Sequence, residues 1–173
     1  QLASQEGKLQ ETRRLLEEQI AKFPEDPTAA LLLAQVELGA EQPDKAKLYV
    51  QKILQRDPMH REALVLDYFI GVVQGRPSID ARAKAIATMG TRRKLAELLQ
   101  ENGLTEEAEV VLTDALTTEP DDLVVPVLLV MIYTVTNRTP EATALQAATL
   151  AKVSEPDKRA ELEASFANAI AQA

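Results

Sequence analysis

The chain has 173 residues, of which 46% are hydrophobic and only 3% aromatic, and its 27 acidic and 19 basic residues give a formal net charge of −8. It contains no cysteine, which excludes a disulfide framework, a thiol nucleophile and a thiolate metal site within these residues. The acidic balance opposes nucleic-acid binding, because neutralising phosphates requires a basic surface.

The start of the chain carries no targeting signal. No positively charged segment followed by an apolar run is present, and a first residue other than methionine, Gln1, predicts a fragment of a longer protein. The most apolar run, residues 123–135, is shorter than the roughly 20 apolar residues that span a bilayer, so no membrane insertion is expected. Cytoplasm and periplasm are both open as locations.

A repeating unit begins to emerge in the first third of the chain. Residues 1–26 fit the second half of such a unit, with Pro24 at its end. Residues 27–60 form a full unit of 34 residues, in which Ala34 is expected at a close helix crossing and Pro58 ends the second helix. Further expectations concern single side chains. Those expected to be buried are Leu31, Leu32, Leu33 and Leu38, and the second helix carries Ala46, Val50 and Ile53 at its repeat positions.

The next unit is shorter than the others. Residues 61–88 provide only 28 positions, so their second helix, roughly residues 78–87, is expected to be short or tilted. Such a unit is open to two interpretations, a hinge or a binding recess.

The pattern continues to the end of the chain. Residues 89–122 form a well-developed unit with a turn at Gly103, and residues 123–156 form a weaker one. The apolar positions expected in the core of the first of these are Leu95, Ala96, Leu99, Ala108, Leu112 and Ala115. Residues 157–173 predict a final helix, which either caps the stack or begins another unit. Its expected apolar face is Leu162, Phe166, Ala169 and Ile170.

These units resemble the tetratricopeptide repeat, a helix pair of 34 residues with small residues at the crossing and a closing proline. The resemblance implies an all-α fold, a right-handed superhelical solenoid of helix pairs, formed here as a single domain over residues 1–173. It also implies a function in protein binding. The lysine and asparagine clamp by which some members hold the acidic tails of heat-shock proteins is absent, since Leu31 and Gln35 stand at its first positions.

In this family the first helix of each pair lines the concave surface and supplies the binding residues. Carried over onto this sequence, the resemblance implies a protein-binding set consisting of Gln35, Leu38, Glu62, Val65, Phe69, Arg93, Glu97, Gln100 and Met131. Phe69 is the strongest anchor candidate, because aromatic side chains dominate interfaces. The alternative for both Phe69 and Met131 is packing in the core.

Catalytic, cofactor and metal sites are not indicated. His60, the only histidine, is interpreted as a loop residue rather than a general base, since no orienting partner accompanies it. The chain lacks a Gly-rich phosphate loop, so no cofactor is predicted. The basic run of residues 76–94 has two interpretations: a solvated face paired across adjacent helices, or a recess for an acidic peptide.

The sequence therefore predicts a noncatalytic scaffold that binds a peptide or protein on the concave face. The alternative is a positioning or targeting domain of a longer enzyme or of a bacterial envelope assembly or secretion factor, with the chemistry elsewhere. Self-association through exposed terminal repeats is a further expectation.

Overall fold

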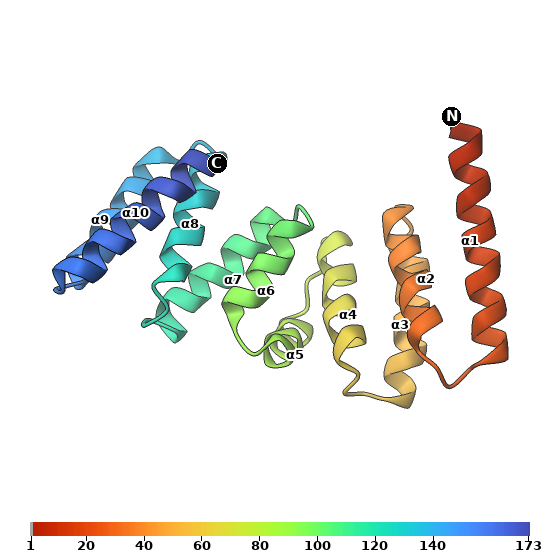
Figure 1. Ribbon diagram of the computed structural model, residues 1–173. Coiled ribbons are helices and arrows are strands. Elements are labelled where there is room, and N and C mark those ends of the chain that lie inside the picture. Colours follow the sequence, from red (N-terminus) through yellow and green to blue (C-terminus); the bar gives the residue numbers. More distant parts are fainter. Residues whose placement is uncertain (1) are drawn as a thin grey trace. The chain divides into compact units, whose positions relative to one another are not determined.

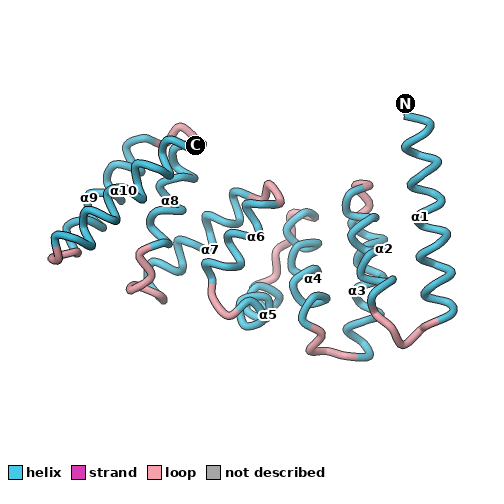
Figure 2. Tube along the Cα trace, in the orientation of Figure 1, coloured by secondary structure: helices cyan, strands magenta, loops and turns pink. Residues whose placement is uncertain are grey.

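The computed structural model describes residues 2–173, which form ten α-helices and no strand (Figures 1 and 2). The helices are α1 (Leu2–Lys22), α2 (Thr28–Gly39), α3 (Pro43–Arg56), α4 (Arg61–Val73), α5 (Ile79–Met89), α6 (Arg92–Glu101), α7 (Thr105–Thr118), α8 (Val124–Val135), α9 (Thr139–Lys152) and α10 (Pro156–Gln172). The predicted all-α fold class is confirmed.

The chain divides into two compact units, residues 1–88 and residues 89–173, here called unit 1 and unit 2. Unit 1 holds α1 to α5, and unit 2 holds α6 to α10. The boundary falls where the shortened repeat of the sequence ends. The single-domain prediction stays a prediction.

The first four helices of unit 1 each pack on the next. α1 packs on α2, α2 on α3 and α3 on α4, and the first helices α2 and α4 also touch each other (Figure 1). Small residues allow this approach: Ala34 and Ala46 have no exposed surface, and they share a core with Val50 and Ile53. The predicted place of the two alanines at a close helix crossing agrees with their complete burial.

The expectation for the four leucines of α2 was partly wrong. Leu33 is fully buried and Leu31 and Leu38 are partly buried, but the side chain of Leu32 is 47% exposed. Successive residues of an α-helix point in directions about 100° apart, so three consecutive leucines cannot all face one core.

A buried ion pair fastens α1 to α2. The Arg13 guanidinium donates two hydrogen bonds to the Glu37 carboxylate, at 2.7 Å and 2.8 Å. The Glu37 side chain is only 4% exposed and that of Arg13 17%. Hydrogen bonding to Glu37 raises the pKa of Arg13 further, so its charge persists. Two-point geometry of this kind fixes the register of α1 against its neighbour.

One turn geometry joins the two helices of every pair. The turn residues Glu41, Gly75, Gly103 and Asn137 all have positive φ, between 57° and 74°. Just after each of them a backbone N–H donates to a carbonyl five residues earlier, as in Arg76 to Gly71 at 2.8 Å and Arg138 to Tyr133 at 2.7 Å. This is the Schellman ending of a helix, which satisfies carbonyls left free at the last turn.

The short unit places α5 close to its predicted span, at Ile79–Met89 against residues 78–87. Ala85 is its one fully buried residue among those the structure describes. Before α5, the chain passes over α4, where the Arg76 carbonyl lies 3.2 Å from the position of a Cβ at residue 71. Gly71 therefore permits this close passage, because a larger residue would press against backbone.

Unit 2 repeats the same packing. α6 packs on α7, α7 on α8 and α8 on α9, and α10 lies mainly against α8. Every core position predicted between residues 95 and 115 is fully buried. In α10, Leu162, Phe166 and Ala169 are buried as predicted, whereas Ile170 is 43% exposed. Ile170 was wrongly placed because it lies about 100° around the helix from Ala169, beyond the edge of the face covered by α8 and α9.

In the part of the chain that the structure describes, no helix combines the length and the apolar character that crossing a membrane requires.

Candidate functional site

The residues carried over from the family resemblance fall into three classes of exposure. Gln35 and Glu62 are exposed. Those that are partly exposed are Leu38, Val65, Arg93, Glu97, Gln100 and Met131. Phe69 is 8% exposed and lies beside the fully buried Tyr68, which places it in the core. The packing alternative therefore describes Phe69, and the remaining eight residues are accessible for contact.

In unit 1 the exposed line on α2 consists of Thr28, Leu32, Gln35 and Gly39. Their spacing of four, three and four residues is that of one helix face. Of the two predicted binding residues of α2, Gln35 lies on this line, whereas Leu38 is half-buried. On α4, exposed Glu62 and half-buried Val65 continue the first-helix face within unit 1.

In unit 2 the most informative feature is an apolar line along α8, formed by Val124, Leu128, Met131 and Val135 and here called the α8 stripe. Val124 is 45% exposed and Val135 is 47% exposed, while Leu128 and Met131 are partly exposed. The whole helix contains no charged residue. A helix that is apolar all round is normally buried on all sides, yet α8 leaves this line open beside α7, α9 and α10.

Ion pairs of Arg93 hold the start of α6 next to the start of α8. Arg93 donates from Nε to Asp122 at 2.8 Å and from Nη1 to Glu97 at 3.0 Å. The other oxygen of Asp122 accepts the backbone N–H of Val124 at 3.0 Å, which begins α8. Bonding to Asp122 and Glu97 raises the pKa of Arg93, so its positive charge is permanent and is balanced by two carboxylates.

Two further bases of the basic run, Arg92 and Lys84, form ion pairs. Arg92 donates to Asp114 at 2.5 Å and to Glu119 at 3.2 Å, and Lys84 lies 2.7 Å from Asp80. The ion pairs of Arg92 thus reach α7 and the turn after it. These contacts favour the interpretation of the run as a paired, solvated face over that of a recess for an acidic peptide.

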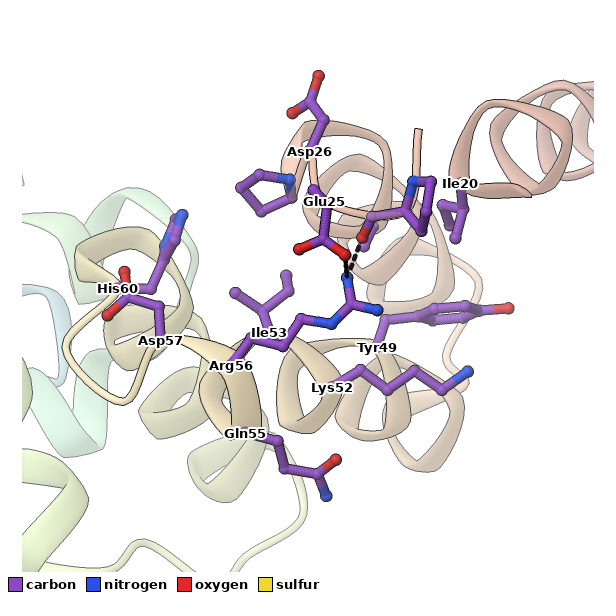
Figure 3. A pocket seen from close by; sticks show the side chains of 13 residues that line it. Ile20, Glu25, Asp26, Tyr49, Lys52, Ile53, Gln55, Arg56, Asp57 and His60 are labelled. Atoms are coloured by element: carbon purple, nitrogen blue, oxygen red, sulfur yellow. Dashed lines mark hydrogen bonds and ion pairs between the residues drawn. The ribbon is translucent and has the colours of Figure 1, made fainter. Parts of the chain in front are cut away.

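A cavity of about 580 Å³ in unit 1 is a second candidate site (Figure 3). Its lining comes from the end of α1, the turns after α1 and α3, and one side of α2 and α3. Arg56 reaches across it, bound to the Pro24 carbonyl and 3.9 Å from Glu25 (Figure 3). Asp26 and Asp57 accept backbone N–H groups of their own turns, at 2.9 Å and 3.1 Å.

The charged groups of the cavity thus hold the inter-repeat turns together. The bond from Thr28 lowers the pKa of Asp26, as expected for a carboxylate that caps a helix start. His60, at its edge, accepts the Ala63 N–H through Nδ1 at 3.4 Å and so caps α4. This helix-capping contact places His60 in the inter-repeat loop, as the sequence indicated. The charged groups of this cavity thus hold the fold together, whereas the faces of the first helices keep accessible side chains.

Sequence reasoning missed two features of the candidate site. It did not find the α8 stripe as a unit, although Met131 was named, because the apolar run of residues 123–135 fits burial on every side. It also did not find that Arg93 is neutralised, because Asp122 lies 29 positions away along the chain. Only the packing of α6 against its neighbours brings these two residues together.

Comparisons with known proteins agree with this architecture. The family model described as Tetratricopeptide repeat matches residues 3–65. A comparison with curated proteins found no match. Among solved structures, the chain shares the fold of the MamA protein, with a TM-score of 0.52 and 18% identity over 91% of this chain and 88% of that one.

Two further solved structures resemble the chain more distantly. One is YrrB, described as a TPR protein with an unusual peptide-binding site, with a TM-score of 0.47 and 16% identity over 91% of this chain and 82% of that one. The other is TTC0263, a thermophilic TPR protein of Thermus thermophilus, with a TM-score of 0.46 and 19% identity over 98% of this chain and 94% of that one. Residues 3–65 thus match the tetratricopeptide-repeat model, and the chain as a whole is similar in fold to a solved structure built of stacked helix pairs.

Proposed function

We propose that this chain is a noncatalytic scaffold that binds a peptide or protein segment on the faces formed by the first helices of its repeats. These are α2 and α4 in unit 1 and α6 and α8 in unit 2. The α8 stripe is the observation that carries the proposal. It is an apolar surface that the described helices leave open, and such surfaces on folded proteins mark interaction sites.

The polar neighbours of the stripe support the same use. Gln100 and Glu97 on α6 are partly exposed and provide hydrogen-bonding groups, and Arg93 links Glu97 to Asp122 in the turn before the stripe. An apolar centre with a polar rim is the usual composition of a protein-binding surface. In unit 1, Leu32 and Gln35 on α2 show the same combination on a smaller scale.

The proposal is tested by selecting binding peptides from a displayed random library and measuring their affinity for the 173-residue chain and two variants. Met131→Asp and Val135→Asp each place a charge in the stripe. We expect each variant to lose at least about tenfold in affinity, because an apolar peptide would remove water from the new carboxylate without pairing its charge. Ala147→Asp, at an exposed position of α9, is the matched control and should bind normally.

Circular dichroism establishes that all three variants fold. Unchanged affinity in both stripe variants, with folding intact, would remove the stripe as the binding surface. Failure to select any peptide that binds either unit would remove the proposed function itself.

A further inference from the structure

The acidic surplus of the chain is confined to one half. Residues 1–88 contain 12 basic and 13 acidic residues, whereas residues 89–173 contain 7 basic and 14 acidic ones. Unit 2 therefore carries nearly all of the net charge of −8. A partner that approaches unit 2 meets a negative field, and one that approaches unit 1 meets a nearly neutral surface.

Internal pairing removes most of the positive charge that unit 2 presents to a partner. Arg92, Arg93 and Arg138 are each bound to two carboxylates. In contrast, Glu101 and Asp121 are exposed and form no ion pair with any described residue. Among the described residues, the charges without an ion pair on α6 and in the turn before α8 are Glu101, Asp121 and one base, the exposed Lys94, so negative charge predominates there.

One of these carboxylates lies just before the α8 stripe in the chain, and the other ends α6. Asp121 lies three positions before Val124, the first residue of the stripe. Glu101 lies one helical turn after Glu97 on the same face of α6. The start of that face lies beside the turn that precedes α8, because Arg93 binds both Glu97 and Asp122. The surface consequently combines an apolar line with negative charges at its edge.

We propose that the α8 stripe of unit 2 binds a cationic amphipathic segment of a partner protein. Apolar side chains of the segment cover Met131 and Val135, and its lysines or arginines lie beside Glu101 and Asp121. This inference rests on the proposed function and adds the chemistry of the partner to it. Charge complementarity of this kind sets the choice of partner and the association rate more than the total affinity.

Two synthetic helical peptides test the inference by fluorescence anisotropy. Both carry leucines at i, i+3, i+4 and i+7 over about four turns, and one has lysines and the other glutamates at the remaining positions. We expect the lysine peptide to bind at least about tenfold more tightly at low salt. The difference should shrink in about 1 M salt, where charges are screened beyond about 3 Å.

A matched pair of double variants shows where the charge acts. E101Q/D121N removes two negative charges next to the stripe, and E106Q/D157N removes two exposed ones elsewhere in unit 2. We expect the first to weaken binding of the lysine peptide about three- to tenfold and the second to change its affinity less than about twofold, because close charges are screened least. Equal weakening by both doubles would overturn the inference, as would equal binding of the two peptides.

Those failures differ from a failure of the proposed function. If both peptides bind equally and V135D abolishes the binding of both, the stripe is the site and the cationic preference is wrong. If V135D and M131D leave binding of the lysine peptide unchanged while the chain remains folded, that binding does not occur at the stripe, and both proposals are overturned.

Discussion

Single alanines decide how closely the helices of each pair approach. Ala46 in α3 and Ala108 in α7 have no exposed surface, and their neighbours fill the space around a methyl group. We expect Ala46→Leu or Ala108→Leu to lower the free energy of unfolding by roughly 1–3 kcal/mol through overpacking. Urea unfolding followed by circular dichroism measures this. Ala147→Leu, exposed on α9, is the control, and an equal effect there would contradict the helix register described above.

The ion pair between Arg13 and Glu37 is a second effect at the scale of the residue. Removal of one partner leaves the other charge nearly buried, so Arg13→Ala should cost about 2–4 kcal/mol. The double variant Arg13→Met with Glu37→Leu replaces the pair by apolar groups and should recover most of that loss. A double-mutant cycle in urea measures the coupling, and a coupling near zero would show that the pair does not hold α1 to α2.

At the scale of the element, Arg138 joins three parts of unit 2. It binds Glu109 of α7 at 2.7 Å and Glu141 of α9 at 3.0 Å, and its guanidinium lies 4.4 Å from the centre of the Tyr133 ring of α8. The bond from Arg138 is the main cause that lowers the pKa of Glu141. A carboxyl with a lowered folded pKa stabilises the folded state above its unfolded value and ceases to do so as the pH falls through the folded value.

Arg138→Met should therefore destabilise the chain more at neutral pH than in acid below the folded pKa of Glu141, where that carboxyl is protonated in either protein. We expect the variant to have a slightly lower urea midpoint at neutral pH, and the difference between the two proteins to decrease as the pH falls. The effect is small because the Glu141 carboxylate is exposed and partly screened. Urea midpoints of both proteins across this range measure it. A difference that stays constant with pH would indicate that the packing on Tyr133, and not the ion pair, supplies the stabilisation.

At the scale of the whole molecule, the division into two compact units leads to a prediction about folding. Each unit has its own core, one around Val50 and the other around Phe166. In repeat proteins stability is approximately a sum over repeats and their nearest neighbours. We therefore expect residues 89–173 alone to be helical and to unfold cooperatively in urea. A fragment that lacks helical signal without denaturant would show that its fold depends on residues 1–88.

How well each part of the site could be predicted from the sequence depends on how far apart in the chain its contacting residues lie. Core positions such as Ala34 and Ala96 were predictable, because they recur at a fixed place in a repeat and small size is a local requirement for close helix packing. Leu32 and Ile170 were misplaced, because a difference of one residue turns a side chain by about 100° around the helix. The turn residues Glu41 and Asn137 were not recognised either, since neither is the glycine expected at positive φ.

The all-α class, the helix pairs and the family resemblance were determined by the sequence alone, since each depends on residue spacing within about 34 positions. Tertiary structure alone decided which surface stays open. Whether the valines of α8 are covered depends on α7, α9 and α10, and whether Arg93 is neutralised depends on Asp122. The exposure of a side chain and the net charge around it depend on neighbours that are distant in the chain. The spacing of residues along the sequence does not determine either one.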